Sequence, residues 1–432
     1  VLPFTLTGAQ VRAIREIVVD MSSARRMHRL LQGDVGSGKT VVALFAALLA
    51  MENDRQVALM APTELLAEQH ARTCTDLLAA LHITPVLLTG RLGVRDRREA
   101  MTKLASHDRV LAIGTHALVQ DSVAFRDLGL VVIDEQHRFG VEQRAALGEK
   151  GQAPDVLLMS ATPIPRSLAL TMYGDLDVTV LDERPPGRQP TTTMHRAESA
   201  RSKVMGFANQ QLDAGRQVYI VYPLIETSEK VDLKAATVMY DELAHGPFAH
   251  RRVALLHGRI PGDERDTIMR RFRDGDVDVL VATTVIEVGI DVANATLMIV
   301  EHPERFGLSQ LHQLRGRVGR GAEQSYCILL GDVGADAAER LAMFTATDDG
   351  FAIAKADLAL RGMGDLFGAR QHGLPAFRIA DPIRDEALNE RARVIADQLL
   401  RADPELTAPA HVPLRRALNA GYARALELFR VG

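Results

Sequence analysis

The chain has 432 residues, of which 47% are hydrophobic and 25% are charged, and its formal net charge is −4. These values are typical of a folded globular protein with two or three domains, and they exclude a mainly disordered chain. They give no global sign of nucleic-acid binding, so any such surface must be a local stripe. The longest apolar run, residues 41–51, is too short to cross a bilayer, so we expect no membrane partner. Cys74 and Cys327 lie far apart without ligand-type neighbours, which predicts neither a disulfide framework nor a zinc site and favours a cytoplasmic location.

A phosphate-binding loop is predicted near the front of the chain, where the sequence reads GDVGSGKT between a strand-like run and an apolar helix. Its glycines, Gly33, Gly36 and Gly38, lack a Cβ atom and allow successive N–H groups to converge on an anion at a helix N-terminus. Lys39 is then expected to neutralise the β- and γ-phosphates of a nucleoside triphosphate, and Thr40 to bind Mg²⁺.

Two adjacent carboxylates, Asp134 and Glu135, follow the apolar run LVVI. At the end of a buried strand, Asp134 can hold the Mg²⁺ shell while Glu135 orients or deprotonates the attacking water. This pair and the phosphate loop, in this order, predict an enzyme that hydrolyses a nucleoside triphosphate. Upstream of the loop, the amide of Gln10 can read adenine bidentately, and an ordinary helix-start glutamine is the alternative.

Two blocks of the chain alternate short β-branched runs with helical stretches, which is the pattern of parallel sheets with crossover helices. The strands predicted in the first block are 29–32, 56–60, 85–89, 110–114, 130–133 and 156–160. Those predicted in the second block are 217–222, 253–257, 279–282, 297–300 and 325–330. A proline-rich break at 183–190 is interpreted as a linker. We therefore predict an α/β fold with two parallel-sheet domains in tandem, residues 1–186 and 187–334.

The C-terminal part of the chain changes to helix without strand. Residues 335–361 are broken near 348–350 and predict a helical hairpin, which a glycine-rich loop follows. Residues 383–400 place apolar side chains at helical spacing among charges, which predicts an amphipathic packing helix. We treat residues 335–432 as a third unit.

A second motif with spaced glycines and arginines, QLRGRVGR, lies in the second block and fits the pattern QxxGRxGR. Arg317 and Arg320 are three residues apart, so on a helix they would project from one face. Arginines so placed can reach across a cleft to the γ-phosphate, where such a finger contributes a factor of roughly 10³–10⁵ in rate. Gln313, Gly289 and Asp291 complete the predicted nucleotide contacts, and Asp291 is able to contact a ribose or an arginine finger.

Small hydroxyls follow two of the predicted strands. Ser160 and Thr162 can relay between the catalytic carboxylates and a bound nucleic-acid strand, although a turn or a helix cap is the alternative interpretation. Thr283 and Thr284 are suited to contacts with a phosphate backbone.

Taken together, these motifs resemble those of superfamily 2 helicases over nearly the whole chain. They are, in order, GDVGSGKT, APTELLAEQH, GTHAL, DEQH, SATPIPR, LLHGR, TTVIEVGID and QLRGRVGR. Four longer strings are similar to the motor of the RecG family: DEQHRFGVEQR, ATPIPRSLALTMYGDLD, EHPERFGLSQLHQLRGRVGRG and RQHGLPAFRIAD. The resemblance implies two RecA-like domains and an ATP-dependent DNA helicase that remodels stalled replication forks and branch-migrates Holliday junctions. ATP and Mg²⁺ are the implied cofactors.

The resemblance also implies a DNA path and a set of coupling residues. The predicted positions on the path are Pro62, Thr63, Glu64, Gly90, Thr115, His116, His137, His257, Gly258, Arg259, Thr283 and Thr284. The hairpin and loop at 335–373 are similar to a translocation motif shared by RecG and Mfd proteins, in which Arg361 and Gln371 match polar anchor positions. Met363 and His372 depart from the family's usual Pro and Ser, which leaves the geometry of this loop open.

The chain begins with Val1, and nothing in it matches the N-terminal wedge domain of RecG proteins, so we expect a motor fragment with weak junction specificity. The resemblance implies branched and duplex DNA and a single-stranded-DNA-binding protein as partners, and a monomer associated with the bacterial nucleoid. Two alternatives stay open: an Mfd-like translocase that couples transcription to repair, and an ATP-gated DNA-binding switch without directional movement.

Overall fold

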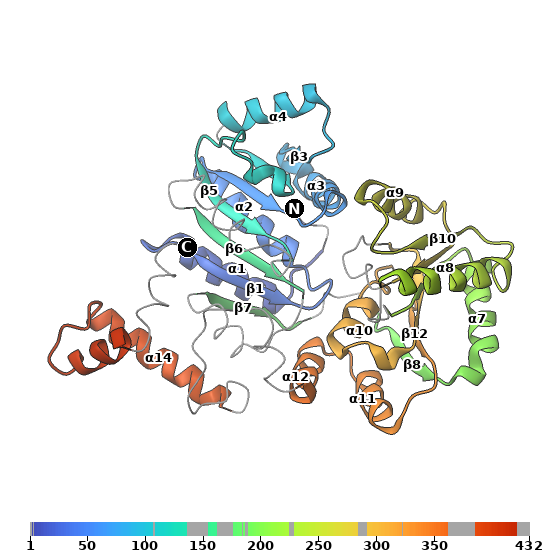
Figure 1. Cartoon of the computed structure of the whole chain (residues 1–432). Coiled ribbons are helices and arrows are strands. Elements are labelled where there is room, and N and C mark those ends of the chain that lie inside the picture. The colour runs from blue at the N-terminus through green and yellow to red at the C-terminus, as the bar shows by residue number, and fades with distance from the viewer. Residues whose placement is uncertain are drawn as a thin grey trace.

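The structure is a computed structural model that describes residues 2, 4–106, 109–135, 154–161, 176–183, 185, 189–223, 229–283, 292–321, 323–361 and 385–420. Two α/β units lie next to each other (Figure 1), and each is built around its own sheet. The predicted α/β fold with two parallel-sheet domains is therefore confirmed. The predicted boundaries at 186 and 334 stay predictions.

The first sheet has seven described strands in the order β3-β4-β2-β5-β6-β1-β7, and all its pairings are parallel. The strands are β1 (His28–Gly33), β2 (Gln56–Met60), β3 (Val86–Leu88), β4 (Leu111–Gly114), β5 (Leu128–Ile133), β6 (Asp155–Ser160) and β7 (Asp177–Leu181). Its helices are α1 (Gly8–Met21), α2 (Lys39–Glu52), α3 (Glu64–Leu78) and α4 (Val94–Ser106), with short 3₁₀ turns η1 (Ala79–Leu81) and η2 (His116–Val119). Successive residues of a strand face opposite sides, so Leu30 and Leu31 enter different apolar clusters. Because both faces are covered, the central strands are mainly apolar, and their polar residues Arg29, Gln32 and Gln56 are buried as well.

The second sheet has six described strands in the order β10-β11-β9-β12-β13-β8, again with parallel pairings. The strands are β8 (Thr192–Arg196), β9 (Gln217–Val221), β10 (Val253–Leu256), β11 (Val279–Ala282), β12 (Ala295–Glu301) and β13 (Tyr326–Leu330). Its helices are α7 (Arg201–Asp213), α8 (Glu229–His245), α9 (Gly262–Arg273) and α10 (Leu308–Arg315), with 3₁₀ turns η4 (Glu198–Ala200) and η6 (Pro303–Arg305). Every strand predicted from the sequence is present in the two sheets.

Two strands, β7 and β8, were not predicted. Each forms an outer edge of its sheet and is only partly buried, so neither carries the long apolar run that marks the central strands. They flank the predicted linker, and the described residues within 183–190 belong to neither a helix nor a strand.

Two helices lie where the sequence predicts a helical hairpin, and the predicted C-terminal unit stays a prediction. Helix α11 (Ala335–Ala346) and helix α12 (Gly350–Arg361) are separated by a short turn and lie against the second unit (Figure 1). Helix α14 (Glu386–Ala402) is present, and its Leu388 and Ile395 are 64% and 53% exposed, so its predicted packing role stays a prediction. The ion pair between Arg393 and Asp177, at 2.6 Å, connects α14 to the first sheet. The predicted glycine-rich loop lies outside the described residues.

Candidate nucleotide site between the two sheets

The phosphate loop connects the end of β1 to the start of α2. Gly36 and Gly38 have φ angles of 77° and 86°, in the left-handed region that glycine adopts without strain. A Cβ atom on Gly38 would lie 2.3 Å from the side-chain nitrogen of Gln10, and one on Gly33 would lie 2.5 Å from Ser37 Oγ. The loop is therefore closely packed at the N-terminus of α2, where backbone N–H groups favour an anion.

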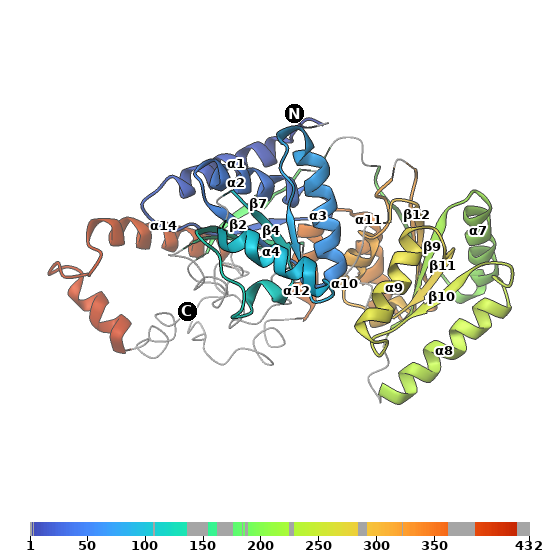
Figure 2. The ribbon, with the colours of Figure 1, turned by 90° about the horizontal axis from the view of Figure 1, so that it is seen from above.

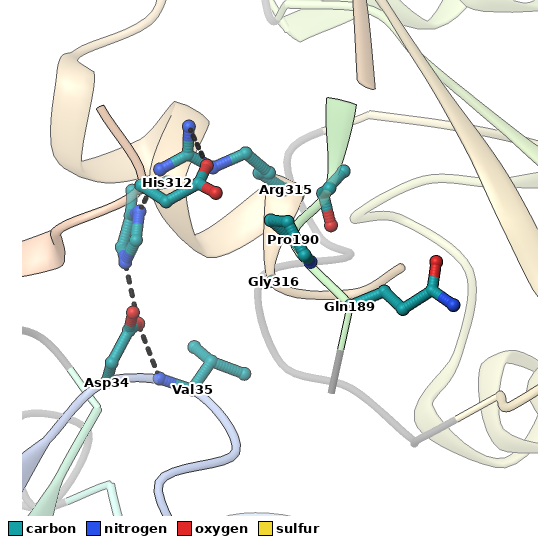
Figure 3. A pocket seen from close by; sticks show the side chains of 9 residues that line it. Asp34, Val35, Gln189, Pro190, His312, Arg315 and Gly316 are labelled. Carbon is teal, nitrogen blue, oxygen red and sulfur yellow. Dashed lines mark hydrogen bonds and ion pairs between the residues drawn. The ribbon is translucent and has the colours of Figure 1, made fainter. Parts of the chain in front are cut away.

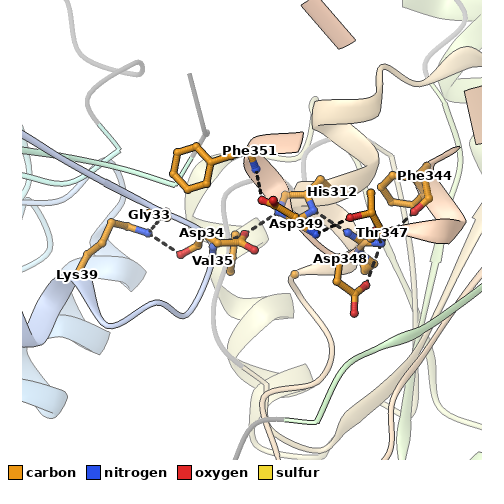
Figure 4. A network of polar contacts seen from close by, with 12 residues as sticks. Gly33, Asp34, Val35, Lys39, His312, Phe344, Thr347, Asp348, Asp349 and Phe351 are labelled. Atoms are coloured by element: carbon orange, nitrogen blue, oxygen red, sulfur yellow. Dashed lines mark hydrogen bonds and ion pairs between the residues drawn. The ribbon is translucent and has the colours of Figure 1, made fainter. Parts of the chain in front are cut away.

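Lys39 lies within this loop and among the predicted catalytic groups. Its Nζ donates hydrogen bonds to the carbonyl oxygens of Gly33, at 2.8 Å, and Asp34, at 3.0 Å (Figure 4). Burial lowers the pKa of Lys39, the carboxylates of Glu135, Asp134 and Asp34 oppose this shift, and the positive charge of Arg320 lowers the pKa further. Groups from both domains therefore act on the same ammonium.

The two carboxylates stand at the end of β5, as predicted. The Asp134 amide donates to Met60 O at 2.9 Å, and one Asp134 oxygen accepts from the Glu135 amide at 3.0 Å. The other Asp134 oxygen lies 2.8 Å from Nε2 of His70, on α3. Burial raises the pKa of Asp134, but the His70 hydrogen bond and the charge of Lys39 outweigh it, so the net pKa is lowered. Asp134 is thus kept in its anionic form, the form of a carboxylate that Mg²⁺ prefers as a ligand.

The residues present fit a magnesium ion that is shared with a bound nucleotide. Within the described ranges, no group of three or more His, Cys, Asp or Glu side chains is arranged to hold a metal ion. Mg²⁺ is usually bound by one or two carboxylates together with substrate phosphates and water, so such a group is not required. Asp134 and Thr40, the first threonine of α2, are the predicted protein ligands.

Gln10 is the third residue of helix α1, and both the oxygen and the nitrogen of its side-chain amide are already hydrogen-bonded. Its oxygen accepts from the Thr7 amide at 3.0 Å, while the Thr7 hydroxyl accepts from the Gln10 amide at 3.2 Å, which makes a capping box. Its side-chain nitrogen donates to Ser37 O at 2.9 Å. The predicted contact of Gln10 with adenine stays a prediction. It requires that the side-chain amide replace its hydrogen bonds to Thr7 and Ser37 with bonds to the base.

The predicted arginine pair follows helix α10 instead of lying on it. The helix ends at Arg315, Gly316 occupies the C-cap, and Gly319 has a φ of 75°, so the chain turns there. The prediction that Arg317 and Arg320 project from one face of a helix is therefore wrong, because the two glycines of the motif end the helix. Arg317 is buried, and Arg320 Nε donates to Gly316 O at 3.1 Å.

Direct contacts join this motif to the phosphate loop across the two units. His312 Nε2 lies 2.6 Å from an oxygen of Asp34, and the backbone of Gly316 lies against the side chain of Val35 (Figure 3). These residues line a cavity of about 40 Å³ together with Gln189, Pro190, Thr191, Arg315 and Asp348. His70, His312 and Arg315 were not singled out from the sequence, where they are ordinary members of the strings APTELLAEQH and QLHQLRGRVGR.

We expect Gly316→Ala to slow nucleotide hydrolysis while leaving each domain folded. The new Cβ atom would lie 2.9–3.1 Å from three side-chain atoms of Val35, so the two units must move apart. Steady-state hydrolysis and the melting temperature measure the two effects. Gly206→Ala on helix α7 is the control, because its Cβ atom meets nothing within 4 Å and alanine favours a helix. Equal hydrolysis by both variants would contradict a functional contact at Gly316.

The described positions of the predicted DNA path share one edge of each sheet. Thr63, Gly90 and Thr115 follow β2, β3 and β4, and Ser160 ends β6. In the second unit His257, Gly258 and Arg259 follow β10, and Thr283 follows β11. Carboxyl ends of parallel strands are where α/β proteins bind ligands. The predicted positions His137, Thr162, Thr284, Gly289, Asp291 and Gln371, and the side chain of Arg361, lie outside the described residues.

Several of these side chains already have local roles. Thr63 caps α3, where its hydroxyl accepts from the Leu66 amide at 3.3 Å, and His257 Nδ1 accepts from the Arg259 amide at 3.2 Å. Thr115 and Thr283 are buried, and within the described part of the chain their hydroxyl oxygens have no hydrogen-bond partner. His116 is exposed at the start of η2. Both buried hydroxyls can therefore still donate a hydrogen bond, and a phosphate oxygen is a suitable acceptor.

Further ion pairs join the two units near α3 and α9, and Figure 2 shows these helices next to each other. Arg91 bonds Glu64 of its own unit at 2.9 Å and also Asp263 and Asp266 at the start of α9, the latter at 3.1 Å. Arg270 of α9 pairs with Glu68 of α3 at 2.7 Å.

Comparisons with known families cover most of the chain. Residues 7–171 match the DEAD/DEAH box helicase family, and residues 202–322 match the helicase conserved C-terminal domain. Residues 347–422 match the C-terminal part of domain 3 of ATP-dependent DNA helicase RecG. The first two matches cover all strands of the two sheets except β7, β8 and β13, and the third covers α12 and α14.

Among curated proteins, the ATP-dependent DNA helicase RecG of Synechocystis sp. is 49% identical over 426 residues, which are 98% of this chain and 51% of that protein. The protein of the same name from Thermotoga maritima is 52% identical over 393 residues, covering 91% of this chain and 50% of that protein. The chain therefore spans about half the length of these curated relatives.

Among solved structures, one of RecG bound to a three-way DNA junction matches with a TM-score of 0.77 at 49% identity, covering 90% of this chain and 51% of that chain. Saccharomyces cerevisiae Dbp5 bound to RNA and ADP BeF3 matches with a TM-score of 0.56 at 17% identity, over 81% of this chain and 92% of its own, which shows the fold alone. Within the described ranges, no helix has the length and apolar character needed to cross a membrane.

Proposed function

Because the chain belongs to the RecG family of ATP-dependent DNA helicases, we propose that it is the motor of a double-stranded DNA translocase that remodels stalled forks and branch-migrates Holliday junctions. The observation that carries the proposal is the direct contact of the phosphate loop with the second unit, where His312 Nε2 lies 2.6 Å from an oxygen of Asp34 and the charges of Asp134, Glu135 and Arg320 all act on Lys39. A site built from two units can translate hydrolysis into relative movement of those units.

The chain's own residues account for each part of hydrolysis. The phosphate loop and the N-terminus of α2 bind the phosphates, and Lys39 exchanges its two carbonyl partners for phosphate oxygens. Glu135 holds the attacking water and accepts its proton, while Arg320 with Arg317 stabilises negative charge that develops on the transferred group. Mg²⁺, held by Asp134 and Thr40, would neutralise the phosphate oxygens when bound.

The partners follow from the same family membership. We propose branched and duplex DNA as substrates, bound at the carboxyl edges of both sheets, together with a single-stranded-DNA-binding protein as a partner of the whole protein. We further propose a monomer that acts in the cytoplasm at the nucleoid. Light scattering in the presence and absence of DNA tests the monomer, and a dimer that persists at low concentration would refute it.

Substitution of Glu135 by glutamine is expected to slow hydrolysis by about 10²–10⁴-fold while nucleotide stays bound, because the amide removes the general base and keeps the shape. Single-turnover hydrolysis and fluorescent-nucleotide binding measure the two effects. Glu52→Gln, at the exposed C-terminal end of α2, is the control. Loss of nucleotide binding in the Glu135 variant would contradict its assignment as the base.

DNA affinity is expected to fall steeply as salt rises and to depend little on sequence, because the predicted contacts are to phosphates. Fluorescence anisotropy with two unrelated duplexes over a salt series measures both properties. A flat salt response, or a strong preference between the duplexes, would argue against a tracking motor.

The decisive experiment combines ATP hydrolysis with strand displacement. Hydrolysis is measured alone and with branched, duplex and single-stranded DNA, and movement is measured as displacement of the third strand from a triplex. The proposal predicts hydrolysis that duplex or branched DNA stimulates, and displacement that requires ATP. Stimulated hydrolysis without displacement would instead indicate the ATP-gated switch. Transcription-linked translocation of the Mfd type is not favoured, since the third family match is to RecG.

A further inference from the structure

An unbroken series of polar contacts leads from the phosphate loop to the turn of the helical hairpin (Figure 4). It begins at Asp34, whose carbonyl oxygen accepts from Lys39 and whose carboxylate lies 2.6 Å from His312 Nε2. It continues from His312 to Arg315, one turn later on α10, whose Nη2 donates to His312 Nδ1 at 2.9 Å. Nothing in the proposed hydrolysis uses these last two side chains.

The contacts specify how His312 is used. An arginine can only donate, so the Nδ1 atom that accepts from Arg315 carries no proton. The neutral ring then carries its proton on Nε2, and this N–H group donates a hydrogen bond to the Asp34 carboxylate. Both ring nitrogens are therefore engaged, one with each unit of the protein, and the ring is buried. A replacement must offer a donor and an acceptor to keep both bonds.

Arg315 anchors the hairpin at the other end of the series. The guanidinium is 4% exposed, donates to Thr347 O at 2.9 Å and pairs with Asp348 at 3.2 Å, in the turn between α11 and α12. It also lies 4.4 Å from the centre of the Phe344 ring. A buried cation with this many partners is held firmly in place.

A second connection makes α10 and the hairpin one body. Asp357 of α12 accepts from the Leu308 amide at 3.1 Å and from the Ser309 hydroxyl at 2.7 Å, at the start of α10. Helix α10 is thus bonded to α12 at its first turn and to the hairpin turn at its last turn. A force that acts on His312, near the end of α10, must therefore move the hairpin as well.

We propose that His312 is a positioning residue that transmits the nucleotide state of the phosphate loop to the helical hairpin. The inference rests on the proposed function. When a triphosphate binds, the Lys39 ammonium exchanges its hydrogen bond to the carbonyl oxygen of Asp34 for one to a phosphate oxygen. The carboxylate of the same Asp34 accepts a hydrogen bond from His312. The phosphate loop with a bound triphosphate and the empty loop therefore place the Asp34 carboxylate differently. Helix α10 and the hairpin, which are bonded to it through His312, follow this change.

The test measures hairpin movement directly, by energy transfer between dyes on α2 and α11. Cysteines replace the exposed Glu52 and Ala342, and the natural Cys74 and Cys327 are buried and stay unlabelled. Transfer is recorded with and without Mg²⁺ and a non-hydrolysable ATP analogue, and affinity for the analogue is recorded on the same samples. The variants are His312→Leu, which removes both bonds at similar volume, His312→Gln, which offers a donor and an acceptor, and the control His250→Ala, an exposed loop histidine.

We expect the analogue to change energy transfer in the wild type, in His312→Gln and in His250→Ala. In His312→Leu the change should be lost although the analogue still binds, and DNA stimulation of hydrolysis should fall about tenfold, a typical allosteric coupling. A full change in the Leu variant would overturn the proposal. So would a shared loss of melting temperature and analogue binding in the Leu and Gln variants, which would make His312 purely structural. If DNA fails to stimulate the wild type while the hairpin still moves, the proposed function fails and the role of His312 stands.

Discussion

Replacement of Lys39 by alanine is expected to reduce ATP hydrolysis by about 10³-fold or more, the upper range for loss of a preorganised charge in a water-excluded site. The ammonium is buried and close to Asp134 and Glu135, and among the described residues it donates to two backbone carbonyls that a phosphate oxygen can replace. Without it, two carboxylates would face the phosphates with no cation from the phosphate loop. Steady-state hydrolysis at saturating ATP and binding of a fluorescent ATP analogue measure the loss.

Lys103→Ala is the matched control for this variant. Its ammonium lies on helix α4, half exposed, in an ion pair with Glu99 at 2.8 Å on the surface of the same domain. Exposed pairs contribute about 0–1 kcal/mol, so hydrolysis and melting temperature should remain close to those of the wild type. Hydrolysis by the Lys39 variant within a few-fold of this control would refute the nucleotide site.

The sequence was sufficient to predict the central strands of both sheets. A strand that is buried on both faces is apolar at most positions, and β2, β9 and β11 carry this signal over four consecutive residues each. The edge strands β7 and β8 lack it, because polar residues interrupt both strands and each has exposed positions. Helix α14 was predicted, but its case shows another limit of the sequence. The periodicity of apolar residues predicts a helix, and it cannot predict which part of the protein covers the apolar face.

The candidate site divides in a similar way. Residues that bind phosphate or water stand in short motifs with fixed spacing, so the sequence could predict the phosphate loop and the pair Asp134 and Glu135. His70 and His312 could not be found in this way, because their partners Asp134 and Asp34 are distant in the chain and meet only after folding. A histidine on a helix has many uses, and only the three-dimensional contact distinguishes among them.

The arginine motif shows why a correct residue can be predicted with a wrong geometry. Spacing alone placed Arg317 and Arg320 on one helical face, yet the glycines that identify the motif also end α10 before either arginine. The turn buries Arg317 and leaves Arg320 half-buried, so the two side chains are in different surroundings. We therefore expect the two positions to respond differently to substitution.

Arg320→Ala is expected to lower the rate of hydrolysis by about 10³–10⁵-fold with a much smaller change in ATP affinity, as for loss of an arginine finger. The guanidinium belongs to the second unit, yet it is close enough for its charge to lower the pKa of Lys39 in the first, so we expect it to reach the phosphates from the opposite side. Charge on the transferred group grows towards the transition state, and an interaction with that charge affects turnover more than binding. Arg320→Lys should recover little, because a single ammonium cannot reproduce the planar fork.

Arg305→Ala is the control for the arginine finger, because Arg305 belongs to the same unit and its side chain is 48% exposed in η6. Arg317→Ala serves as a comparison: its buried guanidinium should cost stability as well as rate, whereas Arg320→Ala should keep the melting temperature of the wild type. Single-turnover hydrolysis, analogue binding and thermal unfolding on all three variants separate these effects. Hydrolysis by Arg320→Ala at the rate of Arg305→Ala would mean that the second sheet supplies no catalytic charge, and the proposal of one active site shared by two units would fail.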